Sequence, residues 1–226
     1  MTKMRVVAIA RNLMVKNDAI AERLRERFAR NGTLVVNLLS SPGSGKTTLL
    51  QATLERLAAR YRAAVLVGDQ ATENDAMRLA RSGVAVRQIT TGAECRLDAD
   101  MVATALADWE ERPCDVLFIE NVGNLICPAE YDLGEDLRVV LFSVTEGEDK
   151  PLKYPLAFNT SHVVVVTKTD IAAAVGYDRD AATTSIRQVN PQARIIELSA
   201  RTGVGMDEWS SLLEERIRAK SLAPAK

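Results

Sequence analysis

Seven short apolar runs alternate with longer segments of mixed polarity along most of this chain. The runs are rich in Val, Ile and Leu on consecutive positions, which is typical of strands buried on both faces of a parallel sheet. They cover residues 33–39, 63–68, 84–90, 115–121, 138–145, 162–168 and 193–200. Segments compatible with helix separate most of them, at 46–61, 97–110, 179–189 and 206–219. This alternation predicts a three-layer α/β fold, with a mostly parallel sheet of about seven strands and helices on both faces.

A helical segment precedes the first strand. Residues 3–31 carry apolar side chains at helical spacing, and Asn31-Gly32 is a typical helix stop. We therefore expect residues 1–32 to form a helix packed on one domain of residues 33–219, with residues 220–226 as a flexible tail.

Composition and charge narrow the class of protein. A net charge of −1 over 226 residues gives no electrostatic support for binding nucleic acid or a membrane surface. No apolar run approaches the roughly 20 residues that span a bilayer, and Arg11 interrupts the N-terminal apolar stretch too early for a secretory signal. The three cysteines, an odd number, indicate free thiols and not disulfides. The expected location is the cytoplasm.

The sequence SSPGSGKTT, residues 40–48, lies between the first predicted strand and the helix that follows. It resembles the phosphate-binding pattern GxxxxGK[ST], except that Ser40 stands at the first glycine position. In such a loop, backbone N–H groups and the helix N-terminus bind phosphate oxygens, a lysine contacts the terminal phosphates and a hydroxyl ligates Mg²⁺. Because Ser40 lies where the chain leaves the strand, we expect its backbone not to need glycine. The predicted phosphate-binding residues are Gly43, Ser44, Gly45, Lys46, Thr47 and Thr48.

Acidic residues follow two other predicted strands. Asp69 ends one strand, with Asp75 six residues later, and Glu120 and Gly123 close another. Carboxylates beside a phosphate loop can hold Mg²⁺ or orient the attacking water, and the Gly123 N–H can contact the γ-phosphate. We predict Lys46, Asp69, Asp75 and Glu120 as catalytic residues, with Thr47, Asp75 and Glu120 around Mg²⁺. Alternatively these acids are solvated, and Asp75 simply favours a helix start.

The last two strands end in residues suited to reading a base. Thr167, Lys168 and Asp170 follow one strand, and Ser199 and Ala200 end the next. Asp170 can accept two hydrogen bonds from guanine, whereas adenine would leave the carboxylate unpaired. The usual GTPase pattern is NKxD, so Thr167 replaces an asparagine. The order of these motifs behind the phosphate loop predicts GTP as the nucleotide.

These motifs, with GDQATENDA, TTGAECRLDADMV, FIENVGNLICPAEYDLGE, SVTEGEDKPLKYP and SARTGVGMDEW, resemble the hydrogenase nickel-incorporation GTPases, the HypB family of the metal-chaperone branch of P-loop GTPases. That family also has a serine at the Ser40 position. The resemblance implies a P-loop NTPase fold and a GTP-dependent homodimer that moves Ni²⁺ toward a [NiFe]-hydrogenase large-subunit precursor. It also implies a zinc-containing maturation partner protein.

The resemblance further implies a metal site at the dimer interface, made of a Cys-His pair and a second cysteine. Cys95 and Cys127 match the cysteines, but Arg96 replaces the histidine, and His162, the one histidine, begins a strand and is expected to be structural. The two cysteines of each of two protomers would suit Ni²⁺ or Zn²⁺. The alternative is that they only pack, as we expect for Cys114.

The segment TEGEDKPLKYP carries two lysines after a predicted strand. The resemblance implies that a lysine here, Lys150 or Lys153, approaches the nucleotide of the other protomer. Two solvated loop lysines are an equally good interpretation.

No arginine or glutamine occupies an obvious catalytic position in the sequence, so slow GTP turnover is expected. Three other functions stay open. The first is an ATP-dependent small-molecule kinase, against which the TKTD and SA segments argue. The others are a related GTPase chaperone for another metalloenzyme or cofactor client, and a metal-binding module in which nucleotide is only structural.

Overall fold

The computed structural model describes residues 2–70, 74–107, 109 and 114–222, with side chains from residue 13 onward. Its centre is one seven-stranded sheet in which all paired strands are parallel. The strands are β1 (Leu34–Ser40), β2 (Ala63–Asp69), β3 (Ala85–Thr90), β4 (Val116–Gly123), β5 (Leu137–Ser143), β6 (Val163–Thr167) and β7 (Arg194–Glu197). Their order across the sheet is β3-β2-β4-β1-β5-β6-β7. The predicted α/β fold with a parallel seven-stranded sheet is confirmed.

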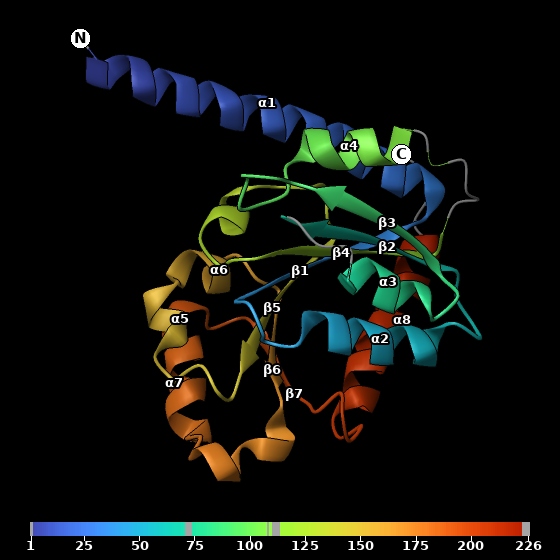
Figure 1. Ribbon diagram of the computed structural model, residues 1–226, viewed down its shortest axis with the longest axis vertical. Helices are drawn as coiled ribbons and strands as arrows, with labels where there is room; N and C mark the ends of the chain where they lie inside the picture. The colour runs from blue at the N-terminus through green and yellow to red at the C-terminus, as the bar shows by residue number, and fades with distance from the viewer. Residues whose placement is uncertain (1, 71–73, 108, 110–113, 223–226) are drawn as a thin grey trace.

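Helices cover both faces of this sheet (Figure 1). They are α1 (Thr2–Asn31), α2 (Lys46–Leu57), α3 (Asn74–Ala80), α4 (Ala99–Ala107), α5 (Lys150–Lys153), α6 (Pro155–Asn159), α7 (Arg179–Val189) and α8 (Met206–Leu222), with 3-10 helices η1 (Cys127–Glu130), η2 (Thr169–Ile171) and η3 (Ala173–Val175). Helices α2, α3 and α8 bury apolar side chains against one face. Helices α1 and α4, and separately α6 and α7, pack on the other. The result is the expected three layers.

Some element ends differ from the expectation. The first helix after β1 stops at Leu57, four residues early, and Arg60 and Tyr61 bond back to the Leu57 carbonyl. The last helix continues to Leu222 instead of ending at 219, and its Lys220 pairs with Asp136. Residue 1, residues 108 and 110 of the helix expected at 97–110, and residues 223–226 of the expected tail lie outside the described residues.

The strand order reverses direction next to β1. From β1 the chain passes through α2 to β2 on one side, while β5 lies on the other side and leads outward to β6. Ligands of such sheets bind in the crevice outside the carboxyl ends of the strands at this reversal. The carboxyl end of β1 is Ser40, which is paired with Gly123 at the end of β4. Both segments belong to predicted site motifs.

Candidate nucleotide site

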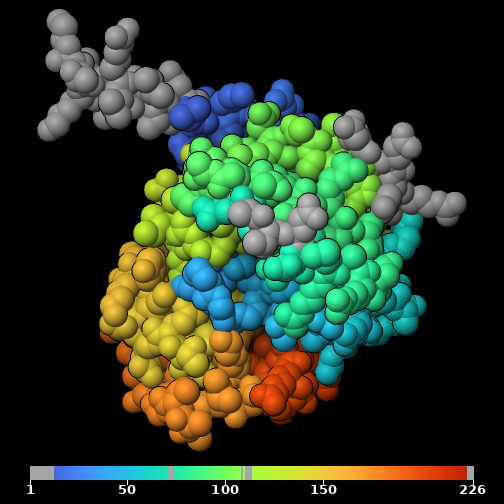
Figure 2. All heavy atoms as spheres, in the orientation of Figure 1, coloured from blue at the N-terminus to red at the C-terminus, as the bar shows by residue number. Residues whose placement is uncertain are grey.

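The loop of residues 41–45 contains two glycines with left-handed backbone, which suits the close approach of a phosphate. Gly43 and Gly45 have φ values of 75° and 97°, in the left-handed region that glycine adopts without strain. A Cβ at either position would meet no atom within 4 Å, so the loop faces open space. Figure 2 shows this light-blue segment at the surface between the yellow segment around α5 and the teal segment around α3.

Ser40 takes a direct part in this site. Its backbone is extended, since Lys168 is the one non-glycine residue with positive φ in the part of the chain that the structure describes. The fully buried Ser40 hydroxyl accepts a hydrogen bond of 2.8 Å from Lys46 Nζ. Burial lowers the pKa of Lys46, whereas the charges of Glu120 and Asp75 oppose that shift. The lysine is therefore held at the base of the loop with its charge favoured by nearby carboxylates.

Thr47 and Glu120 meet beneath the same loop. The Thr47 hydroxyl donates a 2.7 Å hydrogen bond to Glu120 Oε1, while Glu120 Oε2 is buried without a hydrogen-bond partner among the described residues. The pKa of Glu120 is raised to about 7, mainly by burial. The charges of Asp75 and Asp69 also raise it, whereas the Lys46 charge and the Thr47 hydrogen bond lower it. A buried carboxylate oxygen without a donor, next to a threonine hydroxyl, fits the oxygen ligands that Mg²⁺ prefers.

A cleft of about 500 Å³ brings most of the predicted residues together. Its lining includes Gly43, Gly45, Lys46, Thr47, Thr48, Asp69, Asp75, Glu120, Gly123 and Lys168. Gly123 lies close to the loop, because a Cβ there would stand 3.3 Å from Pro42. Gln70 and Arg78 also line this cleft, although the sequence placed no arginine or glutamine in an obvious catalytic position. Arg78 is held by Gln51 at 3.0 Å and Thr48 at 3.3 Å.

The predicted base-reading segments attach to the same loop. Thr167 Oγ1 donates to the Ser44 carbonyl at 2.7 Å, and Lys168 Nζ donates to the Gly43 carbonyl at 2.6 Å. The hydroxyl of Thr167, at the usual asparagine position, thus still secures the phosphate loop. Asp170 is exposed, and Ser199 and Ala200 lie outside the lining of the cleft. The Thr169 N–H donates to the Leu198 carbonyl, which keeps the two base-reading segments side by side.

Glu146 is a neighbour of the phosphate loop that sequence reasoning missed. Its Oε1 accepts hydrogen bonds from Ser44 Oγ at 2.6 Å and Ser143 N at 3.0 Å. Burial alone would raise the pKa of Glu146, but these hydrogen bonds bring it below its ordinary value. Glu146 also pairs with Lys150 at 3.1 Å, whereas the exposed Lys153 pairs with Asp149 at 2.6 Å. No sequence motif pairs Glu146 with a residue 102 positions away.

The expectation of free thiols is wrong for two of the three cysteines. Cys95, after β3, and Cys127, at the start of η1, form a disulfide with their Cα atoms 6.3 Å apart. The fold brings the two segments together because both follow strands at the same edge of the sheet. Arg96 stacks on the Tyr131 ring, with its guanidinium carbon 4.1 Å from the ring centroid. Within the described ranges, no group of three or more His, Cys, Asp or Glu side chains could hold a metal ion.

The remaining cysteine lies at the opposite end of the sheet. Cys114 borders a second cavity of about 460 Å³ with Phe28, Tyr61 and Trp109. Burial raises the pKa of Cys114 to about 11, so its thiol is protonated at neutral pH and unreactive. The single histidine, His162, is exposed, and its Nδ1 accepts a hydrogen bond from the Arg138 backbone N–H.

Comparisons with known proteins agree with this fold. The nucleotide-binding domain described as CobW/HypB/UreG matches residues 34–197. The hydrogenase maturation factor HypB of Azotobacter vinelandii is 46% identical over 224 residues, covering 97% of this chain and 74% of that protein. The structure of HypB from Archaeoglobus fulgidus has a TM-score of 0.84 at 40% identity and covers 90% of this chain and all of that one.

A second solved structure extends the comparison. HypB from Helicobacter pylori, in complex with nickel, has a TM-score of 0.85 at 37% identity, covering 92% of this chain and 98% of that chain. Identity at this level over nearly the whole length, with the same fold, exceeds what a shared P-loop alone produces. This chain belongs to the HypB family of hydrogenase maturation factors, within the CobW/HypB/UreG nucleotide-binding domains.

Proposed function

We propose that this chain binds and hydrolyses GTP with Mg²⁺, and that the nucleotide state controls delivery of nickel to a [NiFe]-hydrogenase precursor. The observation that carries the proposal is the convergence on one loop. Lys46 and the Thr47–Glu120 pair lie beneath residues 41–45, and Thr167 and Lys168 are bonded to the same loop. One segment therefore contacts residues predicted to bind phosphate and Mg²⁺ and also residues of the predicted base-reading segment.

Hydrolysis would be carried out by residues that line the cleft beside the phosphate loop. Lys46 would neutralise charge on the terminal phosphates, and Thr47, Glu120 and Asp75 would hold Mg²⁺, which supplies further neutralisation. Water attacks the γ-phosphorus, the bond from that phosphorus to the β–γ bridging oxygen breaks, and GDP and phosphate leave. Asp69 or Asp75 would orient this water. Slow turnover is expected, because Arg78 is hydrogen-bonded to Gln51 and Thr48 and not directed to the phosphates alone.

Guanine selection would rest on Asp170, beside Lys168 and the segment of Ser199 and Ala200. Asp170 would accept from the ring N–H and the exocyclic amine, and the lysine stem would lie along the base. The left-handed backbone of Lys168, with φ of 61°, directs its side chain back over the phosphate loop to Gly43. A kinase specific for ATP would have no use for this aspartate.

Exposed apolar side chains would form the surface that binds a second protomer. Ile126, Leu152 and Leu156 are 61%, 47% and 44% exposed, and η1 contacts α6. Leu152 and Leu156 are four residues apart across α5 and α6, next to the segment tied to the phosphate loop by Glu146. GTP would favour the closed homodimer, and Lys153 would reach the nucleotide of the partner. Loss of the γ-phosphate would shift the equilibrium away from this closed homodimer.

The cargo would bind at Cys95 and Cys127. Reduced to thiolates, they would supply two sulfur ligands per protomer and four at a dimer interface, a donor set that suits Ni²⁺ or Zn²⁺. The nickel complex of the Helicobacter pylori relative supports nickel. A zinc-containing maturation partner protein and the hydrogenase large-subunit precursor would act before and after this chain in the cytoplasm.

The test of the nucleotide assignment compares GTP with ATP in equilibrium binding, with Lys46→Ala as the control for the phosphate loop. The proposal predicts GTP binding at least about 100-fold tighter than ATP, lost in Lys46→Ala. Equal affinity for the two nucleotides, or tighter ATP binding, would contradict it.

A further inference from the structure

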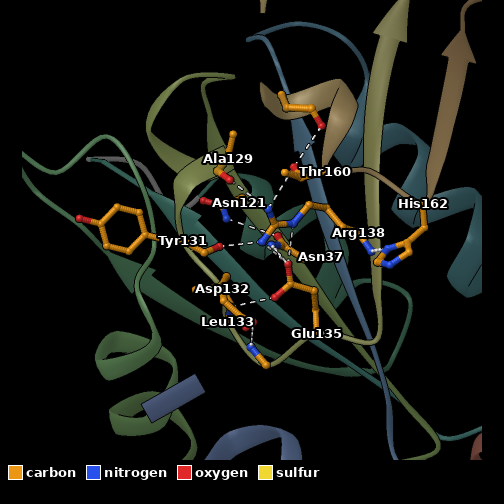
Figure 3. A network of polar contacts seen from close by, with 12 residues as sticks. Asn37, Asn121, Ala129, Tyr131, Asp132, Leu133, Glu135, Arg138, Thr160 and His162 are labelled. Atoms are coloured by element: carbon orange, nitrogen blue, oxygen red, sulfur yellow. Dashed lines mark hydrogen bonds and ion pairs between the residues drawn. The ribbon is translucent and has the colours of Figure 1, made fainter. Parts of the chain in front are cut away.

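The two cysteines lie on separate segments that are not paired with each other in the sheet and do not share a helix. Cys95 follows β3 in a loop, and Cys127 begins the four-residue η1 after β4. Both side chains are half-buried. A site made of two sulfurs needs a fixed separation of these segments. The contacts that hold the segments therefore determine how readily the two sulfurs form a disulfide or bind one metal ion. Figure 3 shows the polar contacts that hold the Cys127 side.

A buried ion pair is the centre of these contacts. Arg138 of β5 and Glu135 are 10% and 4% exposed at their side chains and lie 2.6 Å apart. Arg138 Nε also donates to Glu135 Oε1 at 2.7 Å, and Glu135 Oε2 accepts from the Leu133 N–H at 2.8 Å. The nucleotide cleft does not include either side chain. Since a buried charge pair contributes little net stability on average, such a pair points to a role in fixing geometry.

Arg138 also donates to the segment that carries Cys127, and its Nη1 donates to Thr160 Oγ1 at 3.2 Å as well. Its Nη1 donates to the Ala129 carbonyl at 3.0 Å, and Nη2 donates to the Tyr131 carbonyl at 2.8 Å. A guanidinium has its donors in a rigid planar fork, so it fixes both carbonyls relative to β5. The backbone two and four residues beyond Cys127 is thereby held from the interior of the protein.

Tyr131 passes this constraint to the Cys95 side. Its carbonyl faces Arg138, whereas its ring points away from the buried network (Figure 3). Arg96, next to Cys95, stacks on that ring at 4.1 Å and pairs with Glu94 at 2.6 Å. Asn124 adds a second link, since it donates to the Cys95 carbonyl at 3.4 Å and accepts from the Ile126 N–H at 2.9 Å.

The network also reaches the nucleotide site. Asn37 of β1 donates to Glu135 Oε1 at 3.2 Å, and Asn121 donates to Asn37 at 3.3 Å. Asn121 accepts from the Leu97 N–H, two residues after Cys95, and follows Glu120 directly in β4. Hydrogen bonds therefore connect the strand carrying Glu120 with both cysteine segments.

We propose that Arg138, acting through the Ala129 and Tyr131 carbonyls and the Tyr131–Arg96 stack, is a positioning residue that sets the separation of Cys95 and Cys127 as a two-sulfur site. It contacts neither sulfur. The biological meaning of the site rests on the proposed function, but the positioning itself does not. Arg96 stands where the resembled family has a metal-binding histidine. In this chain it acts on the site through its stacking on Tyr131 and not as a ligand.

The test measures the thiol–disulfide equilibrium of the pair in the full chain, without metal or nucleotide. Two Cys thiols and one glutathione disulfide give the Cys95–Cys127 disulfide and two glutathione thiols, so the equilibrium constant reports how favourably the fold places the two sulfurs. Arg138→Lys keeps the charge for Glu135 but loses the fork to the carbonyls. Tyr131→Leu leaves the ion pair intact and removes the ring under Arg96. Trp209→Phe, which loses a buried hydrogen bond to Thr53 on the opposite face of the sheet, is the control for lost stability.

Arg138→Lys and Tyr131→Leu are each expected to lower this constant at least about tenfold, equivalent to about 30 mV in the reduction potential. GDP affinity should stay within about twofold of the original chain, and Trp209→Phe should leave the constant unchanged. Unchanged constants in both test variants, with melting temperatures lowered as in Trp209→Phe, would overturn the proposal. If Arg138→Lys does not fold, Tyr131→Leu alone decides by the same criterion. Failure of the original chain to bind nickel would refute the metal function and leave this equilibrium test intact.

Discussion

Lys46 Nζ donates a 2.8 Å hydrogen bond to Ser40 Oγ, and these two residues lie at opposite ends of the phosphate loop. A glycine at position 40 would leave this buried lysine without that acceptor. We predict that Ser40→Ala weakens GTP binding by about fivefold, the equivalent of about 1 kcal/mol for one hydrogen bond. Titration with a fluorescent GTP analogue measures the change. Ser40→Thr keeps a hydroxyl and serves as the matched control, and equal losses in both variants would contradict this role.

Glu120 gives a pH dependence that can be measured without ligand. Burial raises its pKa from 4.5 to about 7, so between these values the unfolded chain has released a proton that the folded chain retains. Stability from this group therefore falls as pH rises through that window. Glu120→Gln removes the titration. The melting temperature of the original chain relative to Glu120→Gln should fall between pH 4.5 and 7, and a constant difference would show that Glu120 has an ordinary pKa.

Asp170 provides a test of base selection. Asparagine at this position would donate to the 2-oxo group of xanthine instead of accepting from the guanine amine. Asp170→Asn should weaken GTP binding by about 100-fold and improve binding of xanthosine triphosphate. Asp178→Asn is a control, since the Asp178 carboxylate accepts a hydrogen bond from the Ala181 N–H as the N-cap of α7 and belongs to neither predicted base-reading segment. Unchanged GTP affinity in Asp170→Asn would remove this residue from the base site.

The exposed Ile126 tests the proposed dimer surface. A carboxylate there would be buried without a partner when two protomers associate, which costs several kcal/mol. Ile126→Glu should weaken GTP-dependent dimerisation at least about tenfold, whereas Leu222→Glu, at a residue 83% exposed at the end of α8, should not. Analytical ultracentrifugation measures both. A dimer insensitive to Ile126→Glu would place the interface elsewhere.

The sequence predicted what depends on local pattern. Consecutive apolar residues such as those of 162–168 identified buried parallel strands, and their order then placed Lys46, Glu120 and Lys168 at one edge of the sheet. The position of Ser40 where the chain leaves the strand also predicted a backbone that does not need glycine, as is found. These inferences hold because strands that alternate with helices are parallel, so their carboxyl ends lie at one edge of the sheet, where ligands bind.

Contacts between side chains that are far apart in the sequence were not predicted. The Ser44–Glu146 contact joins residues 102 positions apart, and the Cys95–Cys127 disulfide joins residues 32 positions apart. Arg138 shows the same limit, because in the sequence it is a charged residue at the start of an apolar strand. Only the fold shows that its fork reaches Ala129 and Tyr131.

Light scattering during size-exclusion chromatography would measure the coupling of nucleotide, dimer and metal in one experiment. The reduced chain would be run with a non-hydrolysable GTP analogue or GDP, with and without stoichiometric Ni²⁺, beside Cys95→Ser and Cys127→Ser. We expect a dimer with the GTP analogue and not with GDP, strengthened by Ni²⁺ only when both cysteines are present. A mass that is the same with either nucleotide, or a dimer indifferent to Ni²⁺ and to both cysteines, would contradict this coupling.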